Sequence, residues 1–437
     1  MVPSVASPLV EIERRVLQRA KDETLDLDAA GAARRVGELI SDEVERWRLD
    51  FKHGLREFDL TDPDLVVERA ERNLLGYGPL APLLDDDDVW EIMINAPDEV
   101  FVKRHCGVSG YHDDAFHDDE HVARTLTKLL DDASLSHRKL DAAEGLQDAQ
   151  LDSGARLHIV HRDVGHGGHL LVNIRKFTGV AIRSLDELIE RGTLPPVVAA
   201  FLRAAVQATL SIVFAGPPGS GKTTLLSCCT AELDPGLRVV TAEEVFEVDV
   251  PLPNVASMQT RAGRPDRPEV DLRRLVSGFL RMAPDVAIVG EVRDREALPL
   301  LLTLSSGVKG YTTIHAGSAR QALSRLRFIS QLSDTRSELP VVALTALVTE
   351  AVDLVVQCGR VNGRPRVEEI VAVEDLQSGD GSARFTVTEL FRRDANGTLA
   401  WTGNLPVRCG PALAAAGHDV RGLLEAGPVR AARLDRT

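Results

Sequence analysis

The sequence predicts an α/β protein: a parallel sheet with crossover helices, preceded by a smaller mixed α/β region and a helical N-terminal extension. An apolar strand at 210–215 runs into a glycine-rich phosphate-binding loop, and a helix follows the loop. Strands and helices then alternate to about residue 375, as in a parallel sheet whose strands are joined by helices. The chain has 437 residues, of which 44% are hydrophobic and 27% charged, and this length allows about two to three domains.

Residues 1–60 are expected to form a helical extension. The apolar residues of its second half recur at helical spacing on one face: Val36, Leu39, Ile40, Val44 and Trp47. This face could dock a partner, or it could fold onto the next domain. We favour the second interpretation, because apolar helix faces usually pack within the chain.

Residues 61–176 are expected to form an α/β domain. The expected elements are helices at 63–75 and 120–130 and strands at 89–95, 99–103, 155–161 and 170–177. Two polar clusters invite a metal-site interpretation. The acidic run at 85–88 is better explained as a solvated loop or helix end, because consecutive carboxylates repel one another. The histidines of the second cluster fit no metal-site spacing that we can name, and a polar loop is the better interpretation; they are His158, His161, His166 and His169.

The remaining chain divides into three segments. Residues 177–195 are expected to be a linker with one short helix, and residues 196–375 a P-loop domain built on the parallel sheet. Residues 376–437 are expected to form a C-terminal extension, with strands at 384–392 and 398–402 joined by an Asn396-Gly397 turn.

Composition limits the classes of function. The formal net charge of −15 disfavours a general nucleic-acid binder, because such proteins carry a basic surface. The five cysteines form no C-x-x-C pair, so no zinc ribbon is indicated. Neither a signal-peptide pattern nor a bilayer-spanning apolar run is found. We therefore expect a cytoplasmic protein whose association with the membrane is peripheral.

The phosphate-binding loop is complete at every fixed position of its pattern. Its glycines let backbone N–H groups turn towards a polyphosphate, and the helix that follows directs its positive end at the anion. Lys222 places a charge near the β- and γ-phosphates of ATP, and the Thr223 hydroxyl can bind Mg²⁺. The expected nucleotide-binding residues are Gly216, Pro217, Pro218, Gly219, Ser220, Gly221, Lys222, Thr223 and Thr224.

Three further stretches end strands of the same predicted sheet. Glu243 and Glu244 follow a strand at 239–241, Glu291 follows one at 286–289, and His315 follows one at 311–314. Strand ends of an open parallel sheet face the ligand crevice. Glu243, Glu244 or Glu291 could orient the water that attacks the γ-phosphate. Glu291 could also help to hold Mg²⁺. A histidine beside the γ-phosphate could couple hydrolysis to motion.

Together, GPPGSGKTT, TAEEVFEV, RMAPDVAIVGEVRD and TTIHAGSAR resemble the type II/IV secretion ATPase superfamily, where they are the Walker A loop, Asp box, Walker B strand and His box. GYGPLAPLL, EIMIN and NIRKF make the chain look most like the CpaF branch of tight-adherence pilus ATPases, and especially its actinobacterial members. The resemblance implies a RecA-like P-loop domain, a PAS-like N-terminal α/β domain, a homohexamer, Mg²⁺ and ATP hydrolysis. It also implies inner-membrane platform proteins as partners.

The sequence departs from the superfamily pattern at several positions. The Asp box usually contains Glu-Asp, the Walker B strand usually ends in Asp where Gly290 stands, and 307–310 lacks the first histidine of the His box. The Glu-Glu form and the missing histidine look typical of the actinobacterial members, so we do not interpret them as inactivating. Several relatives carry a four-cysteine zinc module that this chain lacks, which favours the CpaF branch.

An arginine is expected to stabilise the transition state of the γ-phosphate. Arg175 and Arg156 are candidates, because the resemblance places both on the face of the N-terminal domain that closes over the nucleotide. Strand alternation supports Arg175, which shares a face with Leu171 and Asn173. Arg281 and Arg273 are rival candidates.

Three functions are consistent with these motifs. The favoured function is a motor that extracts or polymerises pilins. A nucleotide switch that gates a secretion assembly would bind ATP and stall. A DNA-transfer ATPase, as in conjugation, is disfavoured by the net charge, and no nucleic-acid partner is expected.

Overall fold

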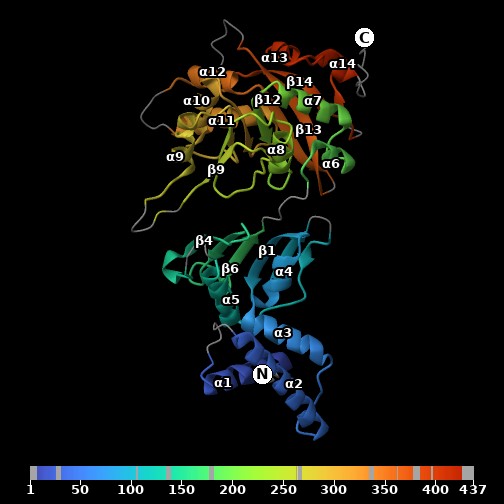
Figure 1. Ribbon diagram of the computed structural model, residues 1–437, viewed down its shortest axis with the longest axis vertical. Coiled ribbons are helices and arrows are strands. Elements are labelled where there is room, and N and C mark those ends of the chain that lie inside the picture. The colour runs from blue at the N-terminus through green and yellow to red at the C-terminus, as the bar shows by residue number, and fades with distance from the viewer. Residues whose placement is uncertain are drawn as a thin grey trace. The chain divides into compact units, whose positions relative to one another are not determined.

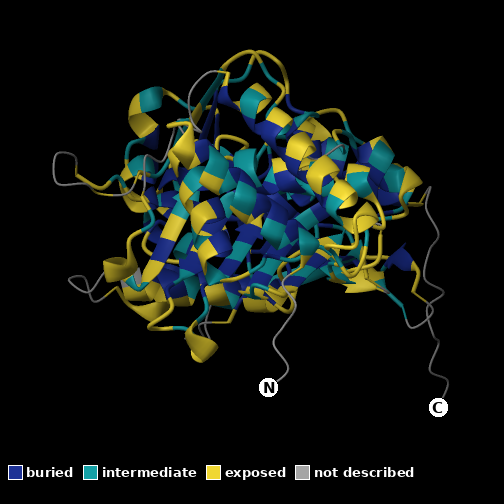
Figure 2. Ribbon diagram, turned by 90° about the horizontal axis from the view of Figure 1, so that it is seen from below, coloured by how far each residue is buried: buried dark blue, intermediate teal, exposed yellow. Residues whose placement is uncertain are grey.

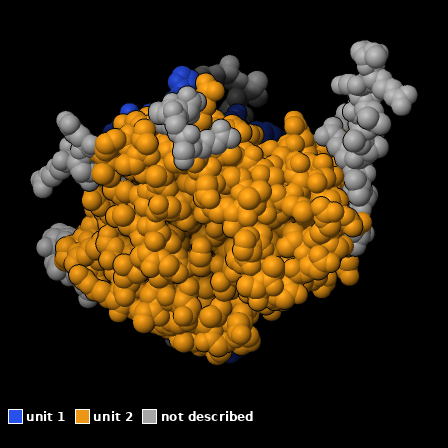
Figure 3. Space-filling model, turned by 90° about the horizontal axis from the view of Figure 1, so that it is seen from above, with its two compact units in different colours: residues 1–178 blue, residues 179–437 orange. Residues whose placement is uncertain are grey.

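The computed structural model describes residues 7–25, 31–104, 107–133, 139–176, 182–261, 263, 268–333, 339–361, 363–376, 384–394 and 397–425. The chain divides into two compact units, residues 1–178 and 179–437, shown in different colours in Figure 3. Within the described ranges, we find no helix that is both long and apolar enough to span a membrane.

Three helices at the start of the first unit share one apolar core: α1 (Pro8–Asp22), α2 (Ala32–Lys52) and α3 (Pro63–Leu75). The predicted apolar face of α2 is buried in this core, between its two neighbours. Asp62 begins α3, because its carboxylate accepts the N–H of Leu65 at 3.0 Å. The α2 face therefore packs inside the chain, and we do not assign it to a partner.

The rest of the first unit is a six-stranded antiparallel sheet in the order β3-β2-β1-β6-β5-β4. Its strands are β1 (Val89–Ala96), β2 (Glu99–Arg104), β3 (Gly110–Tyr111), β4 (Leu146–Gln150), β5 (Arg156–Val160) and β6 (Leu171–Arg175). Helix α5 (Asp119–Asp131) packs its apolar side on the sheet, and the short α4 (Ala81–Asp85) precedes β1 (Figure 1). Strands β3 and β4 were not expected from the sequence.

The second unit is built on a nine-stranded sheet in the order β15-β14-β13-β12-β7-β11-β10-β8-β9. From β12 to β9 the strands pair in parallel, and from β12 to β15 they pair antiparallel. They are β7 (Ile212–Ala215), β8 (Val239–Glu243), β9 (Val255–Gln259), β10 (Val286–Val289), β11 (Lys309–Ile314), β12 (Leu354–Val361), β13 (Arg364–Glu374), β14 (Thr386–Arg393) and β15 (Leu399–Trp401).

Helices pack on both faces of this sheet, and the strands β7 and β10 are buried along their whole length. Figure 2 colours the residues by burial, with buried residues inside and exposed ones at the outside. One apolar core includes side chains of α6 (Leu185–Glu190), α7 (Pro196–Gln207), α8 (Lys222–Thr230), α13 (Gly410–Ala415) and α14 (Val420–Glu425). The other includes side chains of α9 (Leu272–Val276), α10 (Ala297–Ser305), α11 (Ala319–Ser333) and α12 (Val341–Ala351).

The described residues of the segments expected at 177–195 and 376–437 belong to the second unit; they are 182–195, 376, 384–394 and 397–425. Helix α6 buries Leu185 and Leu188 in the same core as α7, so this end of the expected linker is folded. The predicted C-terminal strand pair forms as β14 and β15, which extend the nine-stranded sheet. Asn396 of the predicted turn lies outside the described residues. Long-range packing, which has no local sequence signal, incorporates both segments.

Candidate functional site

The phosphate-binding loop connects the end of β7 to the start of α8. Strand β7 is an interior strand of the sheet, between β12 and β11. Gly221 has a φ of +84°, a backbone conformation that favours glycine. A Cβ at Gly216 would lie 2.4 Å from the carbonyl oxygen of Cys358, so only glycine fits there. The local structure therefore favours glycine at both Gly216 and Gly221, as the phosphate-binding pattern specifies.

The loop holds donors and a hydroxyl that a polyphosphate could use. The carbonyl oxygen of Pro217 accepts hydrogen bonds from Lys222 Nζ at 3.1 Å and from the backbone N–H of Ser220 at 3.3 Å. The Pro217 carbonyl oxygen thus accepts hydrogen bonds from two groups that could instead donate to phosphate oxygens. The Ser220 hydroxyl is buried and finds no hydrogen-bond partner among the described residues. This arrangement fits a loop built for an anion.

Lys222, His315 and Glu291 meet at the ends of neighbouring elements of the unit. Lys222 is only 6% exposed, and its Nζ lies 3.3 Å from His315 Nδ1. His315 Nε2 lies 3.2 Å from Glu291 Oε1. Since β11 and β10 are parallel neighbours, their carboxyl ends deliver these two side chains to the same edge as the loop. The structure therefore brings together three of the predicted site residues.

The partners of His315 favour one neutral tautomer. The Lys222 ammonium can only donate, and the Glu291 carboxylate can only accept. An imidazole with its proton on Nε2 satisfies both, because Nδ1 then accepts from Lys222 and Nε2 donates to Glu291. A proton on Nδ1 would instead face the Gly216 carbonyl oxygen, 3.2 Å away. His315 is thus placed to respond when Lys222 or Glu291 changes its partner.

Arg293 joins the two predicted groups of carboxylates, a contact that was not expected from the sequence. Its guanidinium contacts Glu291 Oε1 at 3.2 Å and Glu244 Oε2 at 3.0 Å. Arg293 follows Glu291 by two residues, but sequence spacing alone did not show that it would also reach Glu244. The contacts extend the network from Lys222 through His315 and Glu291 to Glu244.

Glu243 differs from Glu244 in its surroundings. It is 2% exposed, and its Oε1 accepts the backbone N–H groups of Glu247 and Val248, both at 3.0 Å. These bonds hold the chain that follows β8 in a turn around the carboxylate. Glu243 Oε1 is thus held by backbone N–H groups, whereas Glu291 contacts His315, which in turn contacts Lys222.

Gly290, which stands where the Walker B aspartate is usual, leaves space for Glu243. A Cβ at Gly290 would lie 2.9 Å from both Cγ and Oε1 of Glu243. Because two backbone amides hold that carboxylate, it cannot move away without loss of hydrogen bonds.

Gly290→Ala is expected to destabilise the second unit by about 1–3 kcal/mol, the usual cost of overpacking. Urea unfolding followed by circular dichroism measures it. Gly410→Ala is the matched control, because a Cβ there meets no atom within 4 Å. Equal unfolding midpoints for wild type and Gly290→Ala would show that the space beside Glu243 is not tight.

Thr223 and Glu291 offer oxygen atoms of the kind that Mg²⁺ prefers, a hydroxyl and a carboxylate. Thr223 lies in the first turn of α8 and Glu291 directly after β10 and Gly290, and both side chains are partly accessible. This donor set fits an ion held chiefly by phosphate oxygens.

The polar clusters of the first unit have separate partners. His158 Nδ1 lies 2.7 Å from Asp148, His161 Nε2 lies 3.3 Å from Gln147, and His169 Nδ1 lies 3.0 Å from Asp119. In the part of the chain that the structure describes, no group of three or more His, Cys, Asp or Glu side chains could hold a metal ion. His158 lies within β5 and His161 is buried directly after it, so the polar-loop interpretation fits only His166 and His169, which lie in the segment before β6.

Four cysteines are buried free thiols: Cys228, Cys229, Cys358 and Cys409. Burial raises the pKa of Cys228 and of Cys358 to about 12, so neither is a thiolate at neutral pH. They fill space in the core. Cys106 lies outside the described residues.

Arg156 and Arg175 lie opposite one another on the neighbouring strands β5 and β6 of the first unit. Arg175 is exposed and on the same face as Leu171 and Asn173, while Val172 and Ile174 are buried, as the alternation predicts. Their roles towards a nucleotide stay predictions. In the second unit, Arg281 is exposed at the end of a short 3₁₀ helix, Phe279–Met282.

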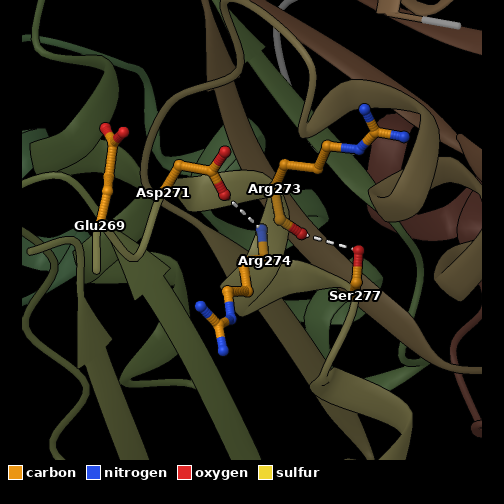
Figure 4. Close-up of a pocket in the computed structure, with 5 residues that line it drawn as sticks. All are labelled: Glu269, Asp271, Arg273, Arg274 and Ser277. Carbon is orange, nitrogen blue, oxygen red and sulfur yellow. Dashed lines mark hydrogen bonds between the residues drawn. The ribbon is translucent and has the colours of Figure 1, made fainter. Parts of the chain in front are cut away.

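Arg273 lines a shallow hollow beside α9, shown in Figure 4 with Glu269, Asp271, Arg274 and Ser277. Two of its polar side chains, Asp271 and Ser277, form hydrogen bonds with the helix backbone. Asp271 accepts the N–H of Arg274 at 2.8 Å, and the Ser277 hydroxyl donates to the carbonyl oxygen of Arg273 at 2.7 Å. The side chains of the two arginines point away from each other, so the hollow does not converge on a ligand.

Residues 73–397 match the model of a protein family described as "Type II/IV secretion system protein". Over 316 residues the chain is 31% identical to a putative conjugal transfer protein of Mycobacterium tuberculosis, covering 70% of this chain and 87% of that protein. It is 28% identical over 326 residues to the type IV secretion system protein VirB11 of Bartonella quintana, covering 67% of this chain and 90% of that protein.

Among solved structures, the chain is similar to the VirB11 ATPase of Brucella suis, crystallised with sulphate, at 27% identity and a TM-score of 0.35. That match covers 67% of this chain and 94% of the other. The ATPase DotB of Legionella pneumophila matches at 18% identity and a TM-score of 0.46, covering 67% and 79%.

Proposed function

Because the chain belongs to the type II/IV secretion system protein family, we propose that it is a cytoplasmic motor that works at the inner face of the cell membrane. Its ATP cycle would drive a secretion system or the assembly of a tight-adherence pilus. The observation that carries the proposal is the meeting of Lys222, His315 and Glu291 beside a complete phosphate-binding loop.

The chain is an ATPase. Its site residues have separate roles in ATP binding and hydrolysis. The loop amides and the N-terminus of α8 bind the phosphates, and Lys222 stabilises negative charge on them. Glu291 orients the attacking water and accepts its proton. Mg²⁺, which Thr223 and Glu291 would hold, supplies positive charge to the phosphate oxygens. His315 relays changes between Lys222 and Glu291.

The proposed assembly is a homohexamer in which each chain combines a RecA-like motor domain with a PAS-like N-terminal domain. The two-unit organisation is consistent with this division. Inner-membrane platform proteins would be its partners, and membrane association would be through them. Within the family, we place the chain in the CpaF branch on its GYGPLAPLL, EIMIN and NIRKF segments.

Steady release of phosphate by the purified protein distinguishes a motor from a switch. A motor is expected to release many equivalents of phosphate per subunit at a constant rate. A single equivalent followed by a stall would instead support a nucleotide switch that gates the assembly.

A DNA-transfer ATPase is the second candidate, because one matched relative is named a putative conjugal transfer protein and another a conjugal transfer protein. The net charge of −15 opposes it, since DNA binding needs a basic surface. Added single- or double-stranded DNA is therefore expected to leave the rate of phosphate release unchanged. A strong DNA-dependent rise in the rate would favour this candidate over the pilus or secretion motor.

Arg175→Ala is expected to lower ATP turnover by more than ~10-fold while the ring stays assembled and ATP affinity stays near wild type. An arginine that stabilises the transition state can contribute ~10³–10⁵ in rate, so this is a cautious lower bound. Turnover and ATP affinity are measured separately, with light scattering to confirm the assembly.

Arg48→Ala is the control, because it removes another exposed arginine of the first unit, on α2. It is expected to leave turnover unchanged. If Arg175→Ala behaves in the same way as this control, Arg175 is a surface residue, and Arg281 becomes the leading candidate for the transition-state arginine.

A further inference from the structure

The β12–β13 hairpin forms one wall of the phosphate-binding loop. Strand β12 runs parallel to β7, with Gln357 level with Ala215, the last residue of β7. Where β7 ends and the loop begins, β12 continues to Val361 before the chain turns back as β13. The carbonyl oxygen of Cys358 accordingly lies against Gly216, with no room for a Cβ between them.

Two hairpin residues reach further along the loop. Arg360 Nη1 donates a hydrogen bond to the carbonyl oxygen of Gly219 at 2.8 Å, and its Nη2 donates to the carbonyl oxygen of Gly363. Pro365 lies beside Gly221, where an added Cβ would meet the proline ring at 3.2 Å. One guanidinium thus connects the hairpin turn to the middle of the loop.

The hairpin is itself anchored to the segment that precedes α7. The N–H of Val367 donates to the carbonyl oxygen of Thr193 at 3.0 Å, and Arg366 donates to the carbonyl oxygens of Arg191 and Gly192. Gln357 also donates to the carbonyl oxygen of Ala316, next to His315. The hairpin is therefore a fixed support from which Arg360 can hold the loop.

We propose that Arg360 is a positioning residue for nucleotide binding, which it supports by fixing the peptide between Gly219 and Ser220. A trans peptide is planar, so its carbonyl oxygen and its N–H point in opposite directions. With the Gly219 carbonyl oxygen held by Arg360, the Ser220 N–H points the other way, towards the Pro217 carbonyl oxygen inside the loop. That N–H is then preoriented for a phosphate oxygen.

This role rests on the proposed function as an ATPase, and it predicts a specific kinetic pattern. A preoriented loop binds the ground state and the transition state equally, so its loss weakens affinity more than turnover. Arg360→Ala is expected to raise the dissociation constant for a fluorescent ADP analogue about 10-fold, the scale of one hydrogen bond to a charged group. The kcat for ATP is expected to stay within about threefold of wild type.

The variant Arg360→Lys distinguishes an effect of the planar guanidinium on the loop from an effect of its positive charge. A lysine keeps the positive charge but lacks the planar fork that joins the Gly219 and Gly363 carbonyl oxygens. If Arg360 positions the loop, Arg360→Lys weakens affinity nearly as much as Arg360→Ala. Arg364→Ala is the matched control: it removes an exposed arginine of the same hairpin, for which we find no hydrogen bond to the loop among the described residues.

Hydrogen–deuterium exchange of the nucleotide-free protein gives a readout that does not depend on activity. The amides of 219–221 are expected to exchange faster in Arg360→Ala than in wild type and Arg364→Ala. Wild-type affinity in Arg360→Ala, or full rescue by Arg360→Lys with unchanged exchange, would overturn the proposal. A wild-type protein that binds no ATP would overturn the proposed function as well, so the two failures are distinguishable.

Discussion

Lys222→Ala is expected to abolish ATP turnover in a protein that still folds. Its ammonium group is nearly buried, at the loop, where Pro217 and His315 hold it. In a water-poor site a fixed charge stabilises the transition state far more than it would in water. Truncation removes this charge, together with little apolar packing, so activity is lost and stability largely kept.

Phosphate release and a thermal melt of the same preparation measure the two effects. The melt is the necessary control, because loss of turnover in an unfolded protein says nothing about Lys222. Turnover near wild type in folded Lys222→Ala would refute the assignment of 216–224 as the nucleotide-binding loop.

Glu291→Gln is expected to bind ATP and to hydrolyse it at least ~10²-fold more slowly, the usual scale for loss of a positioned base. Gln retains a carbonyl oxygen that can still accept from His315 Nε2 and from Arg293, so the local geometry is preserved. The proton-accepting charge is lost. ATP affinity by calorimetry and single-turnover hydrolysis distinguish the binding step from the chemical step.

Glu244→Gln and Glu243→Gln are the comparison variants. Glu244 contacts Arg293 at the far end of the network, and Glu243 is held by two backbone amides that a glutamine oxygen can also accept. Both are expected to retain most of their turnover. A fast Glu291→Gln with an inactive Glu244→Gln would move the catalytic carboxylate to the end of β8.

The sequence predicted that the loop, Glu291 and His315 meet at one edge of the sheet in the second unit, because each of these parts has a local signal. A strand followed by the loop pattern identifies β7, the loop and α8, and short apolar runs identify β10 and β11. Parallel strands place their carboxyl ends at one edge, so the approach of His315 to Glu291 followed from topology alone.

Other contacts depend on residues far apart in the sequence and had no local signal. Arg360 is 141 positions from Gly219, and its hydrogen bond exists only because β12 pairs with β7. The different partners of Glu243 and Glu244 also had no local signal: Glu243 lies against Gly290 and accepts two backbone N–H groups, whereas Glu244 contacts Arg293. The inclusion of α6, β14 and β15 in the second unit likewise follows from core packing.

The structure of the protein with Mg²⁺ and a non-hydrolysable ATP analogue tests the central claim most directly. We predict that the phosphates displace the Pro217 carbonyl oxygen from Lys222 Nζ, contact the loop amides, and lie within reach of Thr223 and Glu291. An analogue bound elsewhere, for example in the hollow beside Arg273, with Lys222 still bonded to Pro217, would contradict the account.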